Sequence, residues 1–147
     1  MLVVDGEGAP IGFLLADANE AEVRLAEPTL ATVRVPKPLG QPGRPRTRPG
    51  QAVADRGHAS RRLRRALARR GIRACIPSIR RAAPFRPRGR PPVARREDYA
   101  RRWIVERTFA WLGTFRRLLV RWERHLSVYR GFFALAVAVV CLRRLLR

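Results

Sequence analysis

The pattern of apolar and polar positions near the start of the chain predicts a β-hairpin followed by a helix. Apolar runs at residues 2–4 and 11–15 have the length of short strands, and the Asp-Gly-Glu-Gly sequence at residues 5–8 suits the turn between them. Residues 20–33 carry apolar positions at helical spacing, so we expect a helix there with Asn19 as its N-cap.

The middle of the chain predicts a strand, a helix and a second strand. Residues 52–54 form a short apolar run that stops at Asp55. Residues 60–70 place their leucines on one helical face, Gly71 suits the C-terminal cap of that helix, and residues 72–76 form another apolar run. Segments rich in proline, glycine and arginine are expected to be loops, and they cover residues 35–50 and 77–96.

Helical periodicity dominates the last third of the chain. Residues 97–124 predict one long helix, with an apolar stripe made of Ile104, Thr108, Trp111, Phe115, Leu118 and Trp122. The tryptophans at 103, 111 and 122 share this spacing, which favours core positions over base-stacking ones. A final helix is expected over residues 127–146. The order of elements predicts a mixed α/β (α+β) fold in one domain over residues 1–147.

The charge of the chain is large and unevenly distributed. Its 147 residues contain 32 Lys and Arg against 11 Asp and Glu, a formal net charge of +21. Residues 1–33 hold six acids and one base, whereas residues 34–147 hold 31 bases and five acids. This charge favours a polyanionic partner, and nucleic acid is the usual one. The alternative is compositional bias alone, because Lys37 is the only lysine and arginine enrichment also arises in GC-rich genomes.

Other features exclude several classes of protein. Cys75 and Cys141 have no metal-ligand spacing, so we expect free thiols and a cytoplasmic location. The first residues have no signal-peptide pattern. The apolar run at residues 131–142 is closed by Arg130 and Arg143 and is shorter than the roughly 20 residues of a bilayer span. We therefore expect a buried or partner-facing helix and no membrane contact.

One polar stripe carries the candidate chemistry. At about 100° per residue, Tyr99, Arg102, Glu106 and Gly113 fall on one helical face, roughly opposite Ile104. The stripe presents one carboxylate with a guanidinium one turn earlier and a phenol two turns earlier. A carboxylate can ligate Mg²⁺, and an arginine beside it can hold a phosphate.

These residues resemble the Tyr-Arg-Glu-Lys signature of insertion-sequence DDE transposases, in particular the insertion-sequence-five-like group. The sequence Val-Glu-Arg-Thr-Phe-Ala-Trp-Leu at residues 105–112, followed by Phe-Arg-Arg at 115–117, is similar to the glutamate region of that group. Ala-Asp-Arg-Gly at residues 54–57 is similar to its second-aspartate segment. The resemblance extends over residues 2–146.

The resemblance implies an RNase H-like catalytic core that cuts and joins DNA in transposition. Two aspartates and a glutamate would hold two divalent ions, Mg²⁺ or Mn²⁺, for metal-assisted phosphodiester transfer. It assigns Asp55 and Glu106 as catalytic residues and metal ligands. The DNA-binding positions that it implies are Tyr99, Arg102, Arg116 and Arg117.

The chain departs from the family pattern in three places. Gly113 stands where the signature has lysine, and His58-Ala59 stands where the family usually has Tyr-Asp. The family's first catalytic aspartate belongs on a strand before the hairpin, and Asp5 is explained by the turn. We therefore expect an N-terminally truncated core with long C-terminal helices, inactive alone.

Several alternatives and partners follow from the same residues. DNA, as element ends and target, is the expected partner, with a homodimer or the product of an upstream open reading frame as further ones. A non-catalytic basic nucleic-acid-binding protein is the main alternative, and a membrane-associated basic protein is another. The arginines of residues 61–70 are expected to contact the DNA backbone, although a solvated helix face would explain them too.

Overall fold

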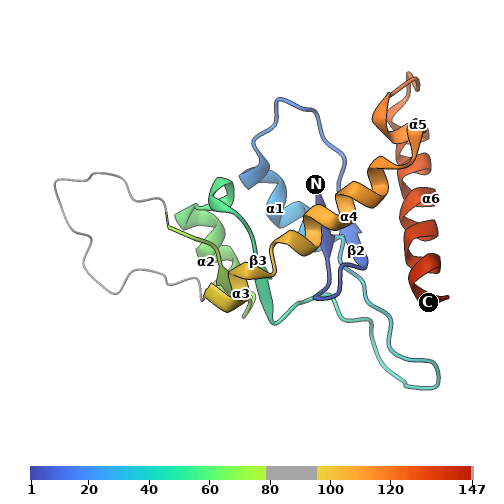
Figure 1. Ribbon diagram of the computed structural model, residues 1–147. Helices are drawn as coiled ribbons and strands as arrows, with labels where there is room; N and C mark the ends of the chain where they lie inside the picture. The colour runs from blue at the N-terminus through green and yellow to red at the C-terminus, as the bar shows by residue number, and fades with distance from the viewer. Residues whose placement is uncertain (79–95, 147) are drawn as a thin grey trace.

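The computed structural model describes residues 1–78 and 96–146 (Figure 1). The expected hairpin is present: β1 (Leu2–Val4) pairs antiparallel with β2 (Pro10–Phe13). In its turn, Oδ1 of Asp5 accepts hydrogen bonds from the backbone amides of Glu7 and Ala9, at 2.9 and 2.8 Å. Asp5 is thus a turn residue, as the sequence predicts.

The first helix begins later than expected. Helix α1 (Glu22–Ala31) starts after Ala21, and no side chain caps it. The assignment of Asn19 as N-cap is therefore wrong. The reason is that Asn19 lies in a separate turn before the helix. In this turn the Glu20 amide donates to the Asp17 carbonyl at 3.1 Å. Pro28 lies inside α1 without ending it.

A parallel strand–helix–strand unit forms the centre of the fold. Strand β3 (Gln51–Val53) pairs in parallel with β4 (Arg73–Cys75), and α2 (Arg61–Arg69) makes the crossover between them. Ser60 caps α2, because its hydroxyl oxygen accepts a hydrogen bond from the Leu63 amide at 3.0 Å. Gly71, just after the helix, adopts a φ of +66°. A short 3-10 turn, η1 (Arg56–His58), links β3 to α2.

The long helix expected over residues 97–124 is wrong, because the chain divides it. The structure has α3 (Arg96–Ala100), α4 (Trp103–Gly113) and α5 (Arg116–Leu119) instead. After Gly113, the Thr114 hydroxyl donates back to the Trp111 carbonyl at 2.8 Å, and Phe115 adopts an extended backbone. This break lets the chain reverse into α6 (Leu126–Leu145), so that Tyr129 can donate to the Leu118 carbonyl at 3.0 Å.

Two apolar clusters hold these elements together. The first packs α1, α2 and the residues around β4, and its buried members are Ala26, Leu30, Leu63, Leu67, Ile72 and Ile76. The second packs the hairpin against α4 and α6, and its buried members are Leu2, Leu112, Ala136 and Val140. Trp111 joins the second cluster, but Trp103 and Trp122 are 52% and 76% exposed, so the core assignment of these two is wrong. The division of the long helix removes Trp122 from the stripe that continues along α4.

Helix α4 is fixed to the hairpin turn. The buried Thr108 hydroxyl donates to the Gly8 carbonyl at 2.9 Å, and Nη2 of Arg107 donates to the Glu7 carbonyl at 2.8 Å. A Cβ at Gly8, where φ is +93°, would lie 3.0 Å from Cγ2 of Ile104. Glycine thus permits the close approach that sets the position of α4, which crosses in front of the hairpin in Figure 1.

The expected loops have different outcomes. Residues 35–50 form a loop clipped by an antiparallel bridge, in which the Val35 and Arg46 backbones exchange hydrogen bonds of 2.9 and 2.8 Å. Most of the expected loop at 77–96 lies outside the described residues. The mixed α/β class is confirmed. Within the described residues the strands form two separate two-stranded sheets.

Candidate active-site cleft

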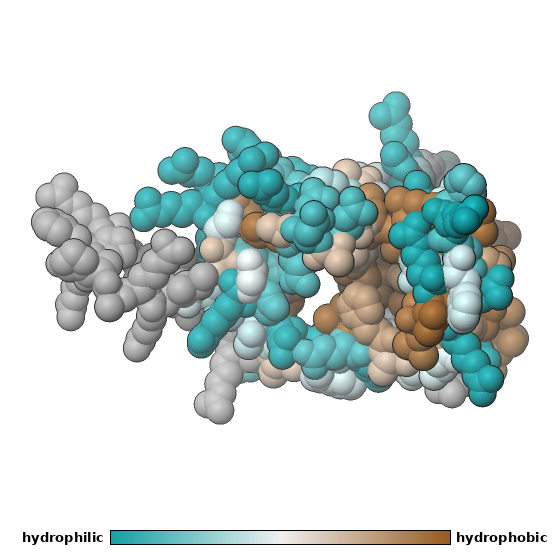
Figure 2. Space-filling view, turned by 90° about the horizontal axis from the view of Figure 1, so that it is seen from above, coloured by the Kyte–Doolittle hydropathy of each residue, from teal (hydrophilic) through white to brown (hydrophobic). Residues whose placement is uncertain are grey.

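A cleft of about 950 Å³ separates the two sheets. Its walls come from β1, from β3 and the residues after it, from α1, and from α3 and α4. Figure 2 shows it as an opening near the middle of the molecule. Asp55 and Glu106 are both among the residues that line this cleft, one after a strand and the other from a helix.

Asp55 stands at the point where β3 ends. Its backbone is extended, with φ −77° and ψ −177°, and it leads directly into η1. A Cβ at Gly57 would lie 3.2 Å from Oδ1 of Asp55, tighter than an ordinary contact. The Asp-Arg-Gly sequence thus leaves room for the carboxylate beside the turn.

His58 holds the carboxylate of Asp55. Nδ1 of His58 lies 2.8 Å from Oδ1 of Asp55, and the imidazole is buried. This side-chain hydrogen bond lowers the pKa of Asp55 below its usual value, and partial burial of the carboxyl acts in the opposite direction. Among the described residues no partner meets Nε2 of His58. From the sequence, His58 is marked only as a departure from the family pattern, so its contact with Asp55 could not be predicted.

Glu22, on α1, is a third candidate ligand beside Asp55 and His58. Glu22, Asp55 and His58 each offer a ligand atom, and these atoms lie within 4.8 Å of one another. Glu22 is exposed and stands in the first turn of its helix. No sequence signal marks Glu22, because it becomes a neighbour of Asp55 only through the packing of α1 against η1.

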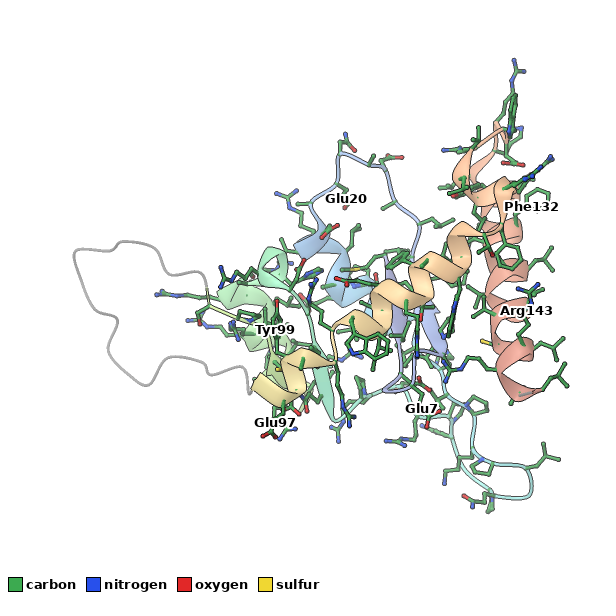
Figure 3. The ribbon with its side chains drawn as sticks, in the orientation of Figure 1. Glu7, Glu20, Glu97, Tyr99, Phe132 and Arg143 are labelled. Atoms are coloured by element: carbon green, nitrogen blue, oxygen red, sulfur yellow. The ribbon has the colours of Figure 1, made fainter. Side chains whose placement is uncertain are left out.

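Glu106 is linked to the other members of the predicted stripe. Nη1 of Arg102 lies 2.8 Å from Oε1 of Glu106, one helical turn away. The same guanidinium stacks over the Tyr99 ring, with Cζ 5.9 Å from the ring centroid. The stripe therefore persists as a chain of contacts although the helix breaks between α3 and α4. Figure 3 labels Tyr99, which belongs to α3.

Charges of both signs surround the cleft. Its acidic lining includes Asp17, Glu20, Glu22 and Asp98 beside the two predicted site residues, and its basic lining includes Arg46, Arg48, Arg101 and Arg102. Acidic groups can hold a cation there, and the arginines can hold phosphate oxygens. A metal-dependent reaction on a phosphodiester needs both kinds of group.

The carboxylates of the cleft fit a divalent cation. Carboxylate oxygens are the donors that Mg²⁺ and Mn²⁺ prefer, which suits Asp55 and Glu106. His58 adds a nitrogen donor near Asp55, which suits softer metals better than Mg²⁺. Glu106 does not belong to the compact group around His58.

The remaining predicted DNA-binding residues lie elsewhere. Arg116 and Arg117 are on α5, and neither lines the cleft. Nε of Arg117 lies 2.9 Å from Oε1 of Glu123, whose side chain is only 5% exposed, and its guanidinium stacks over Phe132 at 5.0 Å. Arg117 therefore has a structural role that sequence reasoning missed.

Comparisons with known proteins show the family of the chain. The profile of the family described as "Transposase DDE domain" matches residues 1–141. The chain is 36% identical over 151 residues to the "Putative transposase for insertion sequence element IS402" of Burkholderia cepacia. That alignment covers 99% of this chain and 63% of the relative. No solved structure matches. The chain belongs to the transposase DDE domain family.

Proposed function

We propose that this domain takes part in DNA transposition by metal-assisted phosphodiester transfer, with Asp55 and Glu106 as its catalytic carboxylates. The observation that carries the proposal is their meeting in one cleft, Asp55 from the end of β3 and Glu106 from α4. Family membership supports the same chemistry. The relative is named as a putative transposase, and the proposal extends that function to this chain. The chain spans only 63% of the relative's length.

Asp55 and Glu106 would hold the divalent ions, Mg²⁺ or Mn²⁺. Such ions, when bound, activate the attacking oxygen and stabilise the leaving oxygen of an in-line displacement. Neighbouring side chains hold the two carboxylates in position. His58 orients Asp55 and lowers its pKa, and Arg102 holds Glu106 in position at 2.8 Å. Tyr99 supports the Arg102 guanidinium by stacking.

Phosphate binding belongs to the arginines in this proposal. Arg101 and Arg102 line the cleft beside Glu106 and can hold the strand that is cut. Arg116 and Arg117, together with the exposed arginines of α2, provide contacts to DNA outside the cleft. The excess of basic residues after residue 33 supports DNA, as element ends and target, as the partner.

The two sheets beside the cleft each have a strand edge that faces it. Among the described residues β1 pairs only with β2 and β3 only with β4, and both β1 and β3 line the cleft. We infer that an RNase H-like sheet is completed when a further strand pairs between these two edges and brings a third carboxylate beside Asp55. In this proposal the described residues alone are inactive, because the remaining catalytic carboxylate comes with the further strand.

The proposed setting is the cytoplasm, where the DNA is. A second copy of the chain, or the product of an upstream open reading frame, is the proposed protein partner. No membrane contact is part of the proposal, although α6 is long and apolar enough to cross a bilayer by length and composition alone. Its packing against the hairpin and α4 supports a role within a folded protein.

The experiment is a cleavage assay with the purified chain, Mn²⁺ and DNA carrying the ends of its own element. We expect binding to the DNA without specific nicking. We expect 3′-end nicking when the polypeptide encoded directly upstream is added, and its loss in Glu106→Gln and Asp55→Asn. Glu97→Gln, on α3 and outside the cleft lining, is the control. Nicking that survives Glu106→Gln would contradict the proposal.

A further inference from the structure

A protruding loop between α1 and β3 forms an arm beside the cleft, and we call residues 35–46 the arm. Its base is closed where the Val35 and Arg46 backbones exchange hydrogen bonds of 2.9 and 2.8 Å. From residue 36 to residue 46 every residue is exposed. In Figure 1 the arm is the cyan loop that extends away from the two sheets. It therefore contributes nothing to the core and is open to a partner.

The tip of the arm is a turn that presents one leucine. The Gln41 amide donates to the Pro38 carbonyl at 3.1 Å, and Gly40 has a φ of +83°. That left-handed value belongs to the third position of a type II turn, which glycine occupies without strain. Leu39 stands at the second position and is 105% exposed, so nothing in the described part of the chain covers it. A lone exposed leucine is common on protein surfaces, so its meaning comes from the arm that carries it.

Contacts within the arm hold it in shape. Nζ of Lys37 donates to the Pro42 carbonyl at 3.1 Å, which ties the two sides of the arm together. A Cβ at Gly43, where φ is +125°, would lie 2.8 Å from that Nζ, so glycine leaves room for the contact. Prolines at positions 36, 38, 42 and 45 restrict the backbone further. A preorganised arm loses less conformational entropy when it binds a partner.

The charge of the arm and its place in the fold point to nucleic acid. Residues 34–48 hold basic side chains and no acidic one. The basic residues are all exposed, and they are Arg34, Lys37, Arg44, Arg46 and Arg48. Arg46 and Arg48 also line the cleft that holds the candidate catalytic carboxylates. The arm thus begins at the wall of the cleft, so a duplex whose strand lies in the cleft would meet it.

We propose that the arm enters the minor groove of the DNA beside the cleft and sets Leu39 against a base step as an apolar wedge. Proteins that bind the minor groove combine Arg and Lys with apolar side chains that part a base step and bend the duplex. Lys37 and Arg44 flank the tip in sequence and would neutralise phosphates beside it. The inference rests on the proposed function, because it takes DNA as the partner, and it adds how the duplex is gripped.

Other occupants fit the arm less well. A stable protein interface buries roughly 800 Å² on each side, which is far more than one leucine offers. The basic residues repel a second copy of this chain, whose net charge is +21. Within DNA, the tip turn offers the bases an apolar side chain and a single amide, that of Gln41. This suits the parting of a deformable base step better than the reading of base edges in the major groove.

The test is binding of the full chain, in chelator, to an A·T-rich duplex with a fluorescent adenine analogue at a central TA step and a dye at each end. Unstacking of the step raises the fluorescence of the analogue, and bending raises energy transfer between the dyes. We expect the wild-type chain to give both signals. Leu39→Ala should lose both and keep the salt dependence of binding, because the phosphate contacts remain. Leu145→Ala, at a leucine that is 83% exposed on α6, is the matched control and should keep both signals.

The charge of the arm is tested by the salt dependence of affinity. Arg44→Ala should reduce the slope of log affinity against log salt by about 1, because one phosphate contact is lost. Arg24→Ala, at an exposed arginine of α1 outside both the arm and the cleft lining, is the control and should leave the slope unchanged. An equal change of slope in the two variants would contradict a role for the arm.

Competition assigns the groove. Distamycin, which fills the minor groove of A·T tracts, should suppress both signals, whereas methyl green, which occupies the major groove, should not. The reverse result overturns the inference, as do signals that survive in Leu39→Ala. Wild-type binding without either signal overturns the arm alone, and a wild-type chain that does not bind DNA overturns the proposed function as well. Because no cleavage is measured, a failed cleavage assay leaves the result for the arm unaffected.

Discussion

Nδ1 of His58 and Oδ1 of Asp55 lie 2.8 Å apart, with the imidazole buried and the carboxylate facing the cleft. The turn after β3 creates this contact by bringing together residues three positions apart. It orients a carboxylate for which we propose a metal, and it lowers the pKa of that carboxylate. A short sequence element, Asp-Arg-Gly-His, therefore encodes a strand end, a turn and a charged group.

The first prediction concerns the ionisation of Asp55 in metal-free protein. The hydrogen bond from His58 lowers the pKa of Asp55, so its contribution to stability is present above the unfolded-state pKa and is lost as pH falls through the folded-state pKa. His58→Ala should raise the pKa of Asp55. Carboxyl NMR titration in chelator measures the shift, and His125→Ala, at an exposed position, is the control. An unchanged Asp55 titration in His58→Ala contradicts the role of this hydrogen bond.

The second prediction concerns the attachment of the hairpin to α4. Thr108→Val removes the hydroxyl that reaches the Gly8 carbonyl and leaves that carbonyl without this donor in a buried place. Unfolding free energy should fall by about 1–3 kcal/mol, measured by urea denaturation. Thr114→Val removes an exposed hydroxyl bond and should change stability by less than about 0.5 kcal/mol. Equal effects of the two substitutions would show that the Gly8 contact is not what positions α4.

The third prediction separates the arginines of α5. Arg117→Ala removes the partner of the buried Glu123 carboxylate and should destabilise the fold by about 1–2 kcal/mol, because the exposed guanidinium is partly screened by solvent. Arg116→Ala should leave stability unchanged, weaken DNA binding and reduce the slope of log affinity against log salt by about 1. Denaturation curves and salt-dependent anisotropy measure the two effects. DNA binding that is indifferent to both Arg116→Ala and salt would remove α5 from the DNA interface.

Local chemistry explains which parts of the fold could be predicted. The hairpin follows from the turn residues at 5–8, and α2 follows from Ser60 and Gly71 at its ends. The division of the helix expected over 97–124 could not be predicted, because apolar spacing continues across Gly113 and only tertiary packing makes the chain reverse. The same packing places Trp122 in solvent.

The candidate site divides in the same way. Asp55 and Glu106 stand on motifs, so the sequence singles out both, and both line the cleft. Glu22 carries no motif and reaches Asp55 only through the packing of α1 on η1. The burial of Glu123 could not be predicted from the sequence either, because it depends on the turn between α5 and α6. Contacts between distant segments are what a single sequence does not reveal.

The central claim is that Asp55 and Glu106 are both ligands of the divalent cations proposed for the cleft. Titration calorimetry with Mn²⁺ on the wild-type chain, Asp55→Asn, Glu106→Gln and the control Glu97→Gln tests it directly. The account predicts at least about tenfold weaker Mn²⁺ binding, or about 1.4 kcal/mol, for the first two substitutions and no change for the control. Mn²⁺ affinity that is unchanged in Glu106→Gln but lost in both Glu22→Gln and His58→Ala would contradict it, because the cation would then sit beside α1 without Glu106.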